Sequence, residues 1–229
     1  NDNDPTAFYD ALKFTDNNFG LAFSDPSANQ RLNITQTRNG GANWINCKNC
    51  KDFPYLEKGE AAFAASNTNI ASFRNVIWIA TGGAKSRIYR MKNKDCNWQV
   101  FETPFTQGTS SQGIYSIDFY DKNFGIAVGG DYTKQSDNIN NIATTNDGGQ
   151  TWQIQASGQN AGYMTCVKFR PKTKGKEIVA VGDQHISFSS DYGKTWTKIS
   201  DEKNLYACEW LDKNTLILAG KDKIVKLNF

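Results

Sequence analysis

The sequence is poor in histidine and has no long apolar run, and each shortage excludes a class of protein. His185 is the only histidine among 229 residues. A zinc site with three histidine ligands is therefore impossible, and a Ser/His/Asp triad could draw only on this residue. The longest apolar stretches, such as VIWIA at 76–80, have the length of a strand, so we expect no membrane span.

An excess of charge of one sign is also missing. Lysine and arginine total 26 and aspartate and glutamate total 23, which gives a net charge of +3. This balance is too mild to indicate a nucleic-acid partner. The hydrophobic fraction of 38% excludes a disordered charged tail, and the phosphate-binding patterns GxGxxG and GxxxxGK[ST] do not occur. A nucleotide enzyme is therefore not indicated, and we expect no cofactor.

Tryptophans mark an internal repeat. Trp44, Trp98, Trp152 and Trp196 lie 54, 54 and 44 residues apart. Three of them end a similar turn, which reads TRNGGANW (37–44), TNDGGQTW (145–152) and SSDYGKTW (189–196). A strand-like apolar run precedes each turn, as in FGIAVGGDY (124–132). A run of alternating aromatic and small residues lies further upstream, as in AAFAASN (61–67), IYSIDFY (114–120) and YMTCVKF (163–169).

These units recur in five modules, and each module offers about four short strands bounded by Gly, Asn and Asp. No stretch shows sustained helical periodicity with caps. The pattern predicts an all-β fold, a single β-propeller of four-stranded antiparallel blades over 1–229. A β-sandwich is the alternative, but it does not need the same turn at a fixed place in each unit. The five predicted blades cover about residues 7–50, 58–103, 110–155, 161–200 and 203–229.

Each residue type in the repeated turn has a structural use. Thr145 and Asp147 can return side-chain oxygens to backbone N–H groups. Gly149 accepts a positive φ, and Trp152 can pack against the neighbouring sheet. The second complete copy has Ser189, Asp191, Gly193 and Trp196 at the same places. We predict that these turns close a hairpin and wedge blades together; binding of a ligand or metal by their aspartates is the less favoured alternative.

The pattern S/T-x-D-x-G-x-T-W resembles the Asp box of sialidase-like (BNR-repeat) propellers. The whole chain is further similar to the photosystem II stability/assembly factor-like branch of that group. The stretches that carry this likeness are AFYDALKF (7–14), GEAAFAASNTNI (59–70), ATGG (80–83), SSQGIYSIDF (110–119), AVGGDYT (127–133), FSSDYGKTW (188–196) and LAGKDKIVKLNF (218–229). The resemblance implies seven blades, whereas five modules are visible. Our hypothesis is that the chain lacks about two N-terminal blades or forms a five-bladed ring closed differently.

Aspartates recur at one place in the modules, directly after the second strand-like run. Asp25, Asp131 and Asp183 stand there, and Asp222 follows in the last module. Loops between second and third strands share one face of a propeller, so these carboxylates should ring the mouth of its central channel. Ordinary turn chemistry is the alternative. The predicted binding face consists of Asp25, Glu60, Arg87, Gln112, Asp131, Tyr132 and Asp183, and its longest loops are 24–33 and 129–141.

The resemblance to sialidases does not supply a catalytic site. Sialidases hold the substrate carboxylate with three arginines and use a Tyr/Glu nucleophile pair, but Arg38 falls in an Asp-box turn on the opposite face. The sequence FRNV at 73–76 also differs from the FRIP motif. Asp25, Glu60 and Asp131 could form the acid pair of a glycoside hydrolase only at the right separation. We therefore assign no catalytic residue.

Five cysteines are present, and they do not define a metal site. Cys47 and Cys50 form a CxxC pair, but zinc needs two more ligands and none is nearby. A local disulfide or two thiols are the open alternatives for this pair. Cys166 and Cys208 stand at similar places in consecutive modules, on the expected innermost strands, where buried thiols are the default. The fifth cysteine is Cys96.

These observations favour a non-catalytic propeller that presents a loop-rich face to a protein partner. The resemblance implies an assembly or accessory role in an extracytoplasmic compartment, periplasmic or secreted. An exported glycan-binding or glycan-cleaving protein is the alternative. A channel mouth with exposed tryptophan and tyrosine beside a close acid pair would favour this alternative.

Overall fold

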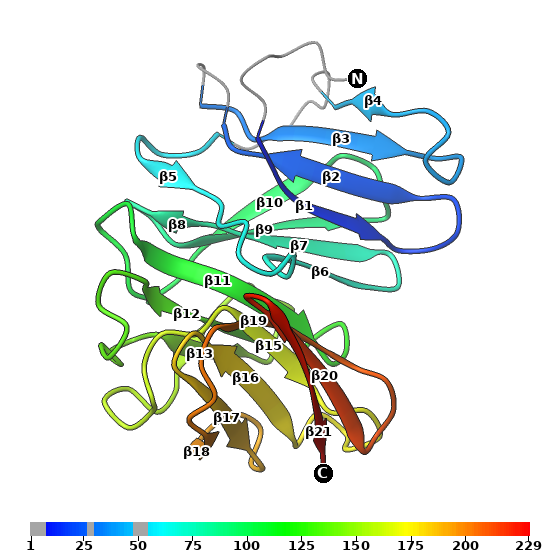
Figure 1. Ribbon diagram of the computed structural model, residues 1–229. Helices are drawn as coiled ribbons and strands as arrows, with labels where there is room; N and C mark the ends of the chain where they lie inside the picture. The colour runs from blue at the N-terminus through cyan, green and yellow to red at the C-terminus, as the bar shows by residue number, and fades with distance from the viewer. Residues whose placement is uncertain (1–7, 27–29, 48–54) are drawn as a thin grey trace.

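The computed structural model describes residues 8–26, 30–47 and 55–229, and every regular element in these ranges is a β-strand (Figure 1). Within the same ranges, no helix is long and apolar enough to cross a membrane. The strands form five antiparallel sheets that follow one another along the chain. We call these sheets blades 1 to 5.

Blades 1 to 4 are each built on a four-stranded meander, and blade 5 has three strands. Blade 1 consists of β1 (Tyr9–Phe14), β2 (Gly20–Ser24), β3 (Asn33–Thr37) and β4 (Ile45–Asn46). Blade 2 consists of β6 (Ile70–Phe73), β7 (Val76–Ala80), β9 (Arg87–Lys92) and β10 (Trp98–Glu102). Blade 3 consists of β11 (Gln112–Phe119), β12 (Gly125–Asp131), β13 (Ile142–Thr145) and β14 (Gln153–Ile154).

Blade 4 consists of β15 (Cys166–Phe169), β16 (Ile178–Gly182), β17 (His185–Ser189) and β18 (Thr197–Ser200). Blade 5 consists of β19 (Leu205–Trp210), β20 (Thr215–Gly220) and β21 (Lys223–Asn228). Two short strands, β5 (Glu60–Ala61) and β8 (Gly82–Gly83), extend the sheet of blade 3 beyond β11. Gly82 is required there, because a Cβ on it would lie 2.8 Å from the Cα of Gly113.

The innermost strand of blade 2 is not where the sequence pattern predicted it. We expected it at 61–67, but β6 begins at Ile70, and residues 62–69 contain no strand. The ring of Phe63 instead stacks on Tyr115 of blade 3 at 4.0 Å. Ser66 donates a hydrogen bond to the Thr165 carbonyl at 2.7 Å. This segment therefore connects blades through side chains, although its aromatic and small residues imitate a strand.

A separate hydrophobic core lies between each pair of consecutive blades. Side chains of Phe23, Ile34, Ile77 and Ile79 join blades 1 and 2. Trp78, Ile88, Phe119 and Trp152 join blades 2 and 3. Ile126, Val128, Ile178 and Trp196 join blades 3 and 4, and Val179, Val181, Leu216 and Leu218 join blades 4 and 5. Face-to-face packing of successive sheets thus holds the molecule together.

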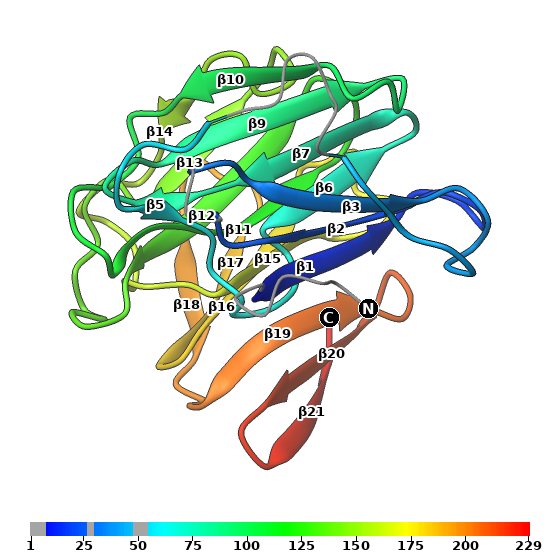
Figure 2. The ribbon, with the colours of Figure 1, turned by 90° about the horizontal axis from the view of Figure 1, so that it is seen from above.

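The first strands of the five blades surround a common axis. Contacts run from β1 to β6, then to β11, β15 and β19. One cavity of about 300 Å³ receives side chains from all five strands, including Lys13, Ile70, Asp118, Lys168 and Glu209. Figure 2, in which the molecule is seen from above, shows β1 near the middle of the view and β19 to β21 at its lower edge. We call this space the axial cavity.

Candidate functional site

The predicted binding residues and the repeated turns occupy opposite ends of the strands. Asp131 ends β12, and Asp25 and Asp183 directly follow β2 and β16. The third strands run back antiparallel, so that Gly125 pairs with Thr145 and Ile178 pairs with Ser189 at the far end. The turns that follow Thr145 and Ser189 therefore lie on one face, and the three aspartates lie on the other, which we call the loop face.

Asp131 is held as a charged carboxylate at the loop face. Its Oδ1 accepts hydrogen bonds from the Thr133 amide at 2.9 Å and the Thr133 hydroxyl at 2.6 Å. Burial by itself would raise the pKa of Asp131, but the hydrogen bonds from Thr133 and Ser111 outweigh it and lower the pKa. Gln112 pairs with Asp131 across β11 and β12. The carboxylate is thus ionised and fixed in place.

Tyr132 projects beside this carboxylate and leaves half of its surface, 51%, exposed. Two buried tyrosines that the sequence reasoning missed, Tyr115 and Tyr163, interact with it electrostatically. The ring of Tyr115 meets Tyr163 edge-on at 4.8 Å, and the Tyr115 hydroxyl donates to the Ser111 carbonyl at 2.8 Å. Burial is the main cause that raises the pKa of both buried tyrosines, and the Tyr132 side chain adds to the effect. The available signal was a tyrosine near the start of each of the runs IYSIDFY and YMTCVKF.

Asp183 joins the same group through blade 4. Its Oδ2 accepts hydrogen bonds from the side-chain amides of Gln135 at 2.9 Å and Gln184 at 3.1 Å, while its Oδ1 has no partner among the described residues. Its charge also acts on Tyr163, the tyrosine that Tyr132 approaches. The structure therefore brings four predicted residues to one region. We call Gln112, Asp131, Tyr132 and Asp183 the Tyr132 cluster.

Glu60 and Arg87 form a buried ion pair with each other. Their exposed fractions are 2% and 8%. The Arg87 Nε lies 3.2 and 3.1 Å from the two Glu60 carboxylate oxygens. Tyr89 and Thr81 donate further hydrogen bonds to the same carboxylate at 2.8 and 2.5 Å. Both Glu60 oxygens are thus occupied by the chain itself, and the ion pair joins β5, at the edge of the sheet of blade 3, to β9 of blade 2.

Asp25 lies beside a second acid, Asp10, which the sequence reasoning did not single out. Its Oδ1 accepts a hydrogen bond from the Ala62 amide at 3.1 Å. Burial, followed by the charge of Asp25, raises the pKa of Asp10 to about 7. Burial also raises the pKa of Asp25. The only signal for Asp10 was an acidic residue inside the strand-like run FYDALKF.

The two complete turns share one pattern of hydrogen bonds. Asp147 Oδ1 accepts from the Thr145 hydroxyl at 2.8 Å and the Thr151 amide at 2.9 Å, and Asp191 does the same with Ser189 and Thr195 at 2.9 Å each. The Trp152 and Trp196 indole N–H groups donate to the carbonyls of Gly149 and Gly193 at 3.1 and 2.9 Å. Gly149 and Gly193 have φ values of +83°.

Each of these turns also packs on the preceding blade. The Trp78 indole of blade 2 donates to the Gly148 carbonyl at 2.9 Å, and Arg90 donates to the same carbonyl at 2.8 Å. A Cβ on Gly193 would lie 3.0 Å from Ile126 of blade 3. The turn aspartates therefore serve the backbone and the contact between blades.

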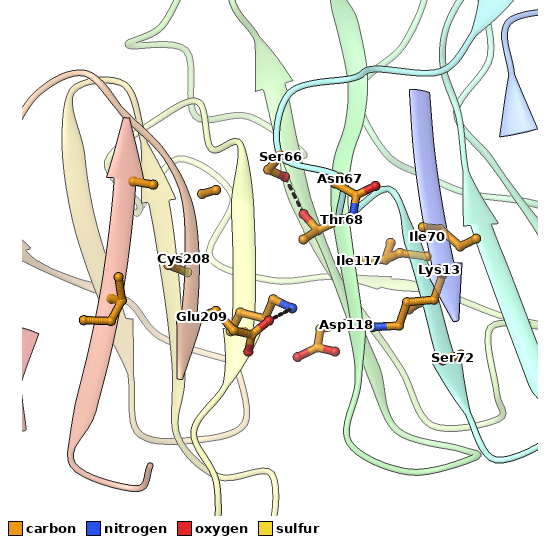
Figure 3. Close-up of a pocket in the computed structure, with 15 residues that line it drawn as sticks. Lys13, Ser66, Asn67, Thr68, Ile70, Ser72, Ile117, Asp118, Cys208 and Glu209 are labelled. Atoms are coloured by element: carbon orange, nitrogen blue, oxygen red, sulfur yellow. Dashed lines mark hydrogen bonds and ion pairs between the residues drawn. The ribbon is translucent and has the colours of Figure 1, made fainter. Parts of the chain in front are cut away.

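The axial cavity is the second polar site of the molecule (Figure 3). Lys13, Asp118 and Glu209 reach into it from β1, β11 and β19. Lys168 and Glu209 form an ion pair of 2.6 Å, and Asp118 accepts the Phe169 amide at 2.9 Å. Burial raises the pKa of Asp118. Among the described residues, no group of three or more His, Cys, Asp or Glu side chains is arranged to hold a metal ion.

No model of a protein family matches the chain, and no curated protein matches it. Solved structures do match. The nidogen/laminin complex aligns with a TM-score of 0.64 at 13% identity, covering 98% of this chain and 77% of that chain. The WD40 β-propeller domain of Doa1 aligns with a TM-score of 0.62 at 11% identity, covering 97% of this chain and 65% of that chain.

The fold is a β-propeller. The likeness at these identities concerns the fold alone, and it confirms the fold class that the repeats predicted. YCF48 bound to a D1 peptide also aligns, with a TM-score of 0.44 at 14% identity, covering 97% of this chain and 93% of that chain.

Proposed function

We propose that this propeller is a non-catalytic scaffold whose Tyr132 cluster binds a basic, extended segment of a partner protein. The observation that carries the proposal is the exposed ring of Tyr132, which directly follows the ionised Asp131 in a loop that also contacts Asp183 through Gln135. Asp131 and Asp183 are held by hydroxyl, amide and backbone groups, and neither forms an ion pair with a described residue. Tyrosine at such a position supplies contact area, and the carboxylates supply charge complementarity.

The shape of the molecule supports a protein partner. Rigid propellers present loops from one face, and the nidogen/laminin structure, which shares this fold, is a protein complex. The turns at 145–152 and 189–196 bond as an Asp box would, which supports the sialidase-like (BNR-repeat) relationship that their sequences indicate. An assembly or accessory role outside the cytoplasm, in the periplasm or as a secreted protein, is part of this proposal.

The glycan alternative requires a pair of available acids and an exposed aromatic ring on the loop face. Of the three acids considered for a hydrolytic pair, Glu60 is occupied by Arg87, Tyr89 and Thr81. The exposed tryptophan that would favour sugar stacking is Trp44, which ends a repeated turn on the opposite face. Asp10 and Asp25 are neighbouring acids, but no exposed tryptophan of the described residues accompanies them on the loop face, so these observations favour the protein partner over a glycan.

Affinity capture from native extract tests the proposal. The bait is this chain, and the test variant is Tyr132→Ala. Tyr192→Ala is the matched control, because Tyr192 is also about half exposed, at 43%, but lies in a turn on the opposite face. We expect a captured protein whose affinity falls roughly 30-fold with Tyr132→Ala, as for an interface hot spot, and falls with added salt. Tyr192→Ala should bind as the unmodified bait does.

Two outcomes contradict the proposal. One is equal loss of the captured protein with both variants. The other is retention or cleavage of polysaccharide by the bait with no protein captured, which would support the glycan alternative.

A further inference from the structure

Two cysteine thiols meet where blades 4 and 5 contact each other. Cys166 begins β15 and Cys208 lies in β19, and both side chains are buried. Their Sγ atoms are 3.7 Å apart. A disulfide bond is about 2.05 Å long, so the sulfurs need to approach by roughly 1.7 Å, a distance that small rotations of two side chains can cover.

The surroundings of Cys166 stabilise a negative charge on its sulfur. The Cys208 amide donates to this sulfur at 3.4 Å, and the Thr68 hydroxyl donates at 3.8 Å. The Cys208 thiol, followed by the positive charge of Lys168, lowers the pKa of Cys166 to about 7 against the effect of burial. The same coupling raises the pKa of Cys208. Of the two thiols, Cys166 is therefore the one that loses its proton more readily.

The axial cavity reaches the pair on the side of Cys208, and Cys166 is fully buried behind Cys208 and Thr68, so a small molecule reaches its sulfur when these side chains move. Cys208 and Thr68 both line this cavity, and both contact the Cys166 sulfur. Figure 3 shows Cys208 beside Glu209 at the wall of the cavity, across from Thr68. A volume of about 300 Å³ admits an oxidant of the size of hydrogen peroxide.

We propose that Cys166 and Cys208 form a hydroperoxide-responsive pair that closes to a disulfide between blades 4 and 5. The Cys166 thiolate attacks one oxygen of hydrogen peroxide, the O–O bond breaks, and hydroxide leaves, which gives a sulfenic acid on Cys166. Cys208 then loses its proton to the hydroxide, and water is formed. The Cys208 thiolate attacks the Cys166 sulfur and releases a second hydroxide. The two sulfurs together lose two electrons, and the two peroxide oxygens gain them.

Side-chain contacts join blades 4 and 5, and the disulfide would add a covalent link between them. The Thr165 hydroxyl donates to the Tyr206 carbonyl at 2.7 Å, and Lys168 pairs with Glu209, but β15 and β19 belong to different sheets. Blade 5 is the three-stranded sheet at the end of the chain. Closing a loop between positions 166 and 208 restricts the unfolded chain, so we expect the midpoint of thermal unfolding to rise by roughly 5 °C or more.

The test treats the full chain with hydrogen peroxide, blocks remaining thiols under denaturing conditions, and maps peptides by mass spectrometry. We expect a peptide pair joined through Cys166 and Cys208 that a dithiol reductant separates. The variant Cys208→Ser should retain a sulfenic acid on Cys166, which dimedone labels, and Cys166→Ser should give no label at position 208. Cys96→Ser is the control, because Cys96 is half-buried in blade 2 and should not affect the cross-link.

The wild-type chain alone decides the outcome if a variant does not fold. A Cys166–Cys208 cross-link with a raised unfolding midpoint, present in the wild type and in Cys96→Ser, supports the proposal. Full blocking of both cysteines after peroxide treatment overturns it. Oxidation of Cys166 to a sulfinic acid without a cross-link also overturns it, since Cys208 would then have failed to resolve the sulfenic acid.

Discussion

Asp10 and Asp25 are neighbouring carboxylates that differ from the other acids of the loop face. Burial holds the pKa of Asp10 at about 7, far above the value of 3.8 expected for an unfolded chain. Between these two values the folded protein retains a proton that the unfolded chain has lost. The stabilising contribution of Asp10 is therefore complete below about pH 4 and is lost as the pH rises towards 7.

We predict that Asp10→Asn removes this pH dependence. Compared with the wild type, the variant should gain roughly 2 kcal/mol in free energy of unfolding between pH 4 and pH 8, because an amide cannot ionise. Urea unfolding at each pH measures the difference. Asp137→Asn is the control, since this aspartate is exposed in the loop between β12 and β13. If the free energy of unfolding changed with pH in the same way in the wild type and in Asp10→Asn, Asp10 would already be ionised at low pH.

Single binding residues were the least predictable part of the molecule. The repeats indicated aspartates at the ends of second strands, and Asp131 ends β12 while Asp25 and Asp183 directly follow β2 and β16. They could not indicate that Glu60 is buried against Arg87, because that ion pair joins β5 and β9, which are not consecutive in the chain. The closeness of Asp10 and Asp25 depends instead on the register in which β1 pairs with β2, with Tyr9 opposite Ser24. Side-chain surroundings that depend on packing between elements leave no local pattern in a sequence.

At the scale of an element, the turn after β13 contains a network centred on one carboxylate. Asp147 accepts hydrogen bonds from the Thr145 hydroxyl, the Gln150 amide, and the Thr151 amide and hydroxyl. These bonds lower the pKa of Asp147 despite the opposing effect of burial. The carboxylate therefore stabilises the turn in its ionised form.

We predict that Asp147→Ala lowers the free energy of unfolding by about 2 kcal/mol, because several turn N–H and O–H groups lose their acceptor. Chemical denaturation measures the loss. Asn146→Ala is the matched control: it changes an exposed side chain in the same turn and should cost no more than about 0.5 kcal/mol. Capture of a partner through the loop face should be the same for both variants when they are folded. Equal stability of the two variants would contradict the role of the turn carboxylate.

Elements themselves were well predicted where the period was clear. The apolar runs that end at Ala80, Asp131 and Gly182 are β7, β12 and β16, and the tryptophan turns connect third and fourth strands of blades 1, 3 and 4. The exception was 61–67, where alternation of aromatic and small residues predicted a strand. Contacts of Phe63 and Ser66 with blades 3 and 4 override that local preference. In this segment, a connection that packs between blades has the same alternation of aromatic and small residues as a strand.

At the scale of the whole molecule, the five blades are not equally protected. Each residue of β12 is buried, and its sheet packs against blades on both sides. Residues of β20 and β21 are instead mostly half-buried or exposed, and β21 is the outer strand of a three-stranded sheet. Local opening costs less where fewer apolar contacts cover the backbone hydrogen bonds. Blade 5 should therefore open more readily than blade 3.

Hydrogen exchange followed by mass spectrometry measures this difference directly. We predict that amides of β20 and β21 exchange at least roughly tenfold faster than those of β12, since opening of blade 5 breaks only the core shared with blade 4. Oxidation of the reduced chain with hydrogen peroxide provides the internal comparison. If Cys166 and Cys208 then join the two blades, exchange in blade 5 should slow while exchange in β12 stays unchanged. Equal exchange of β12 and β21 in the reduced chain would instead mean that the blades open together, as one cooperative unit.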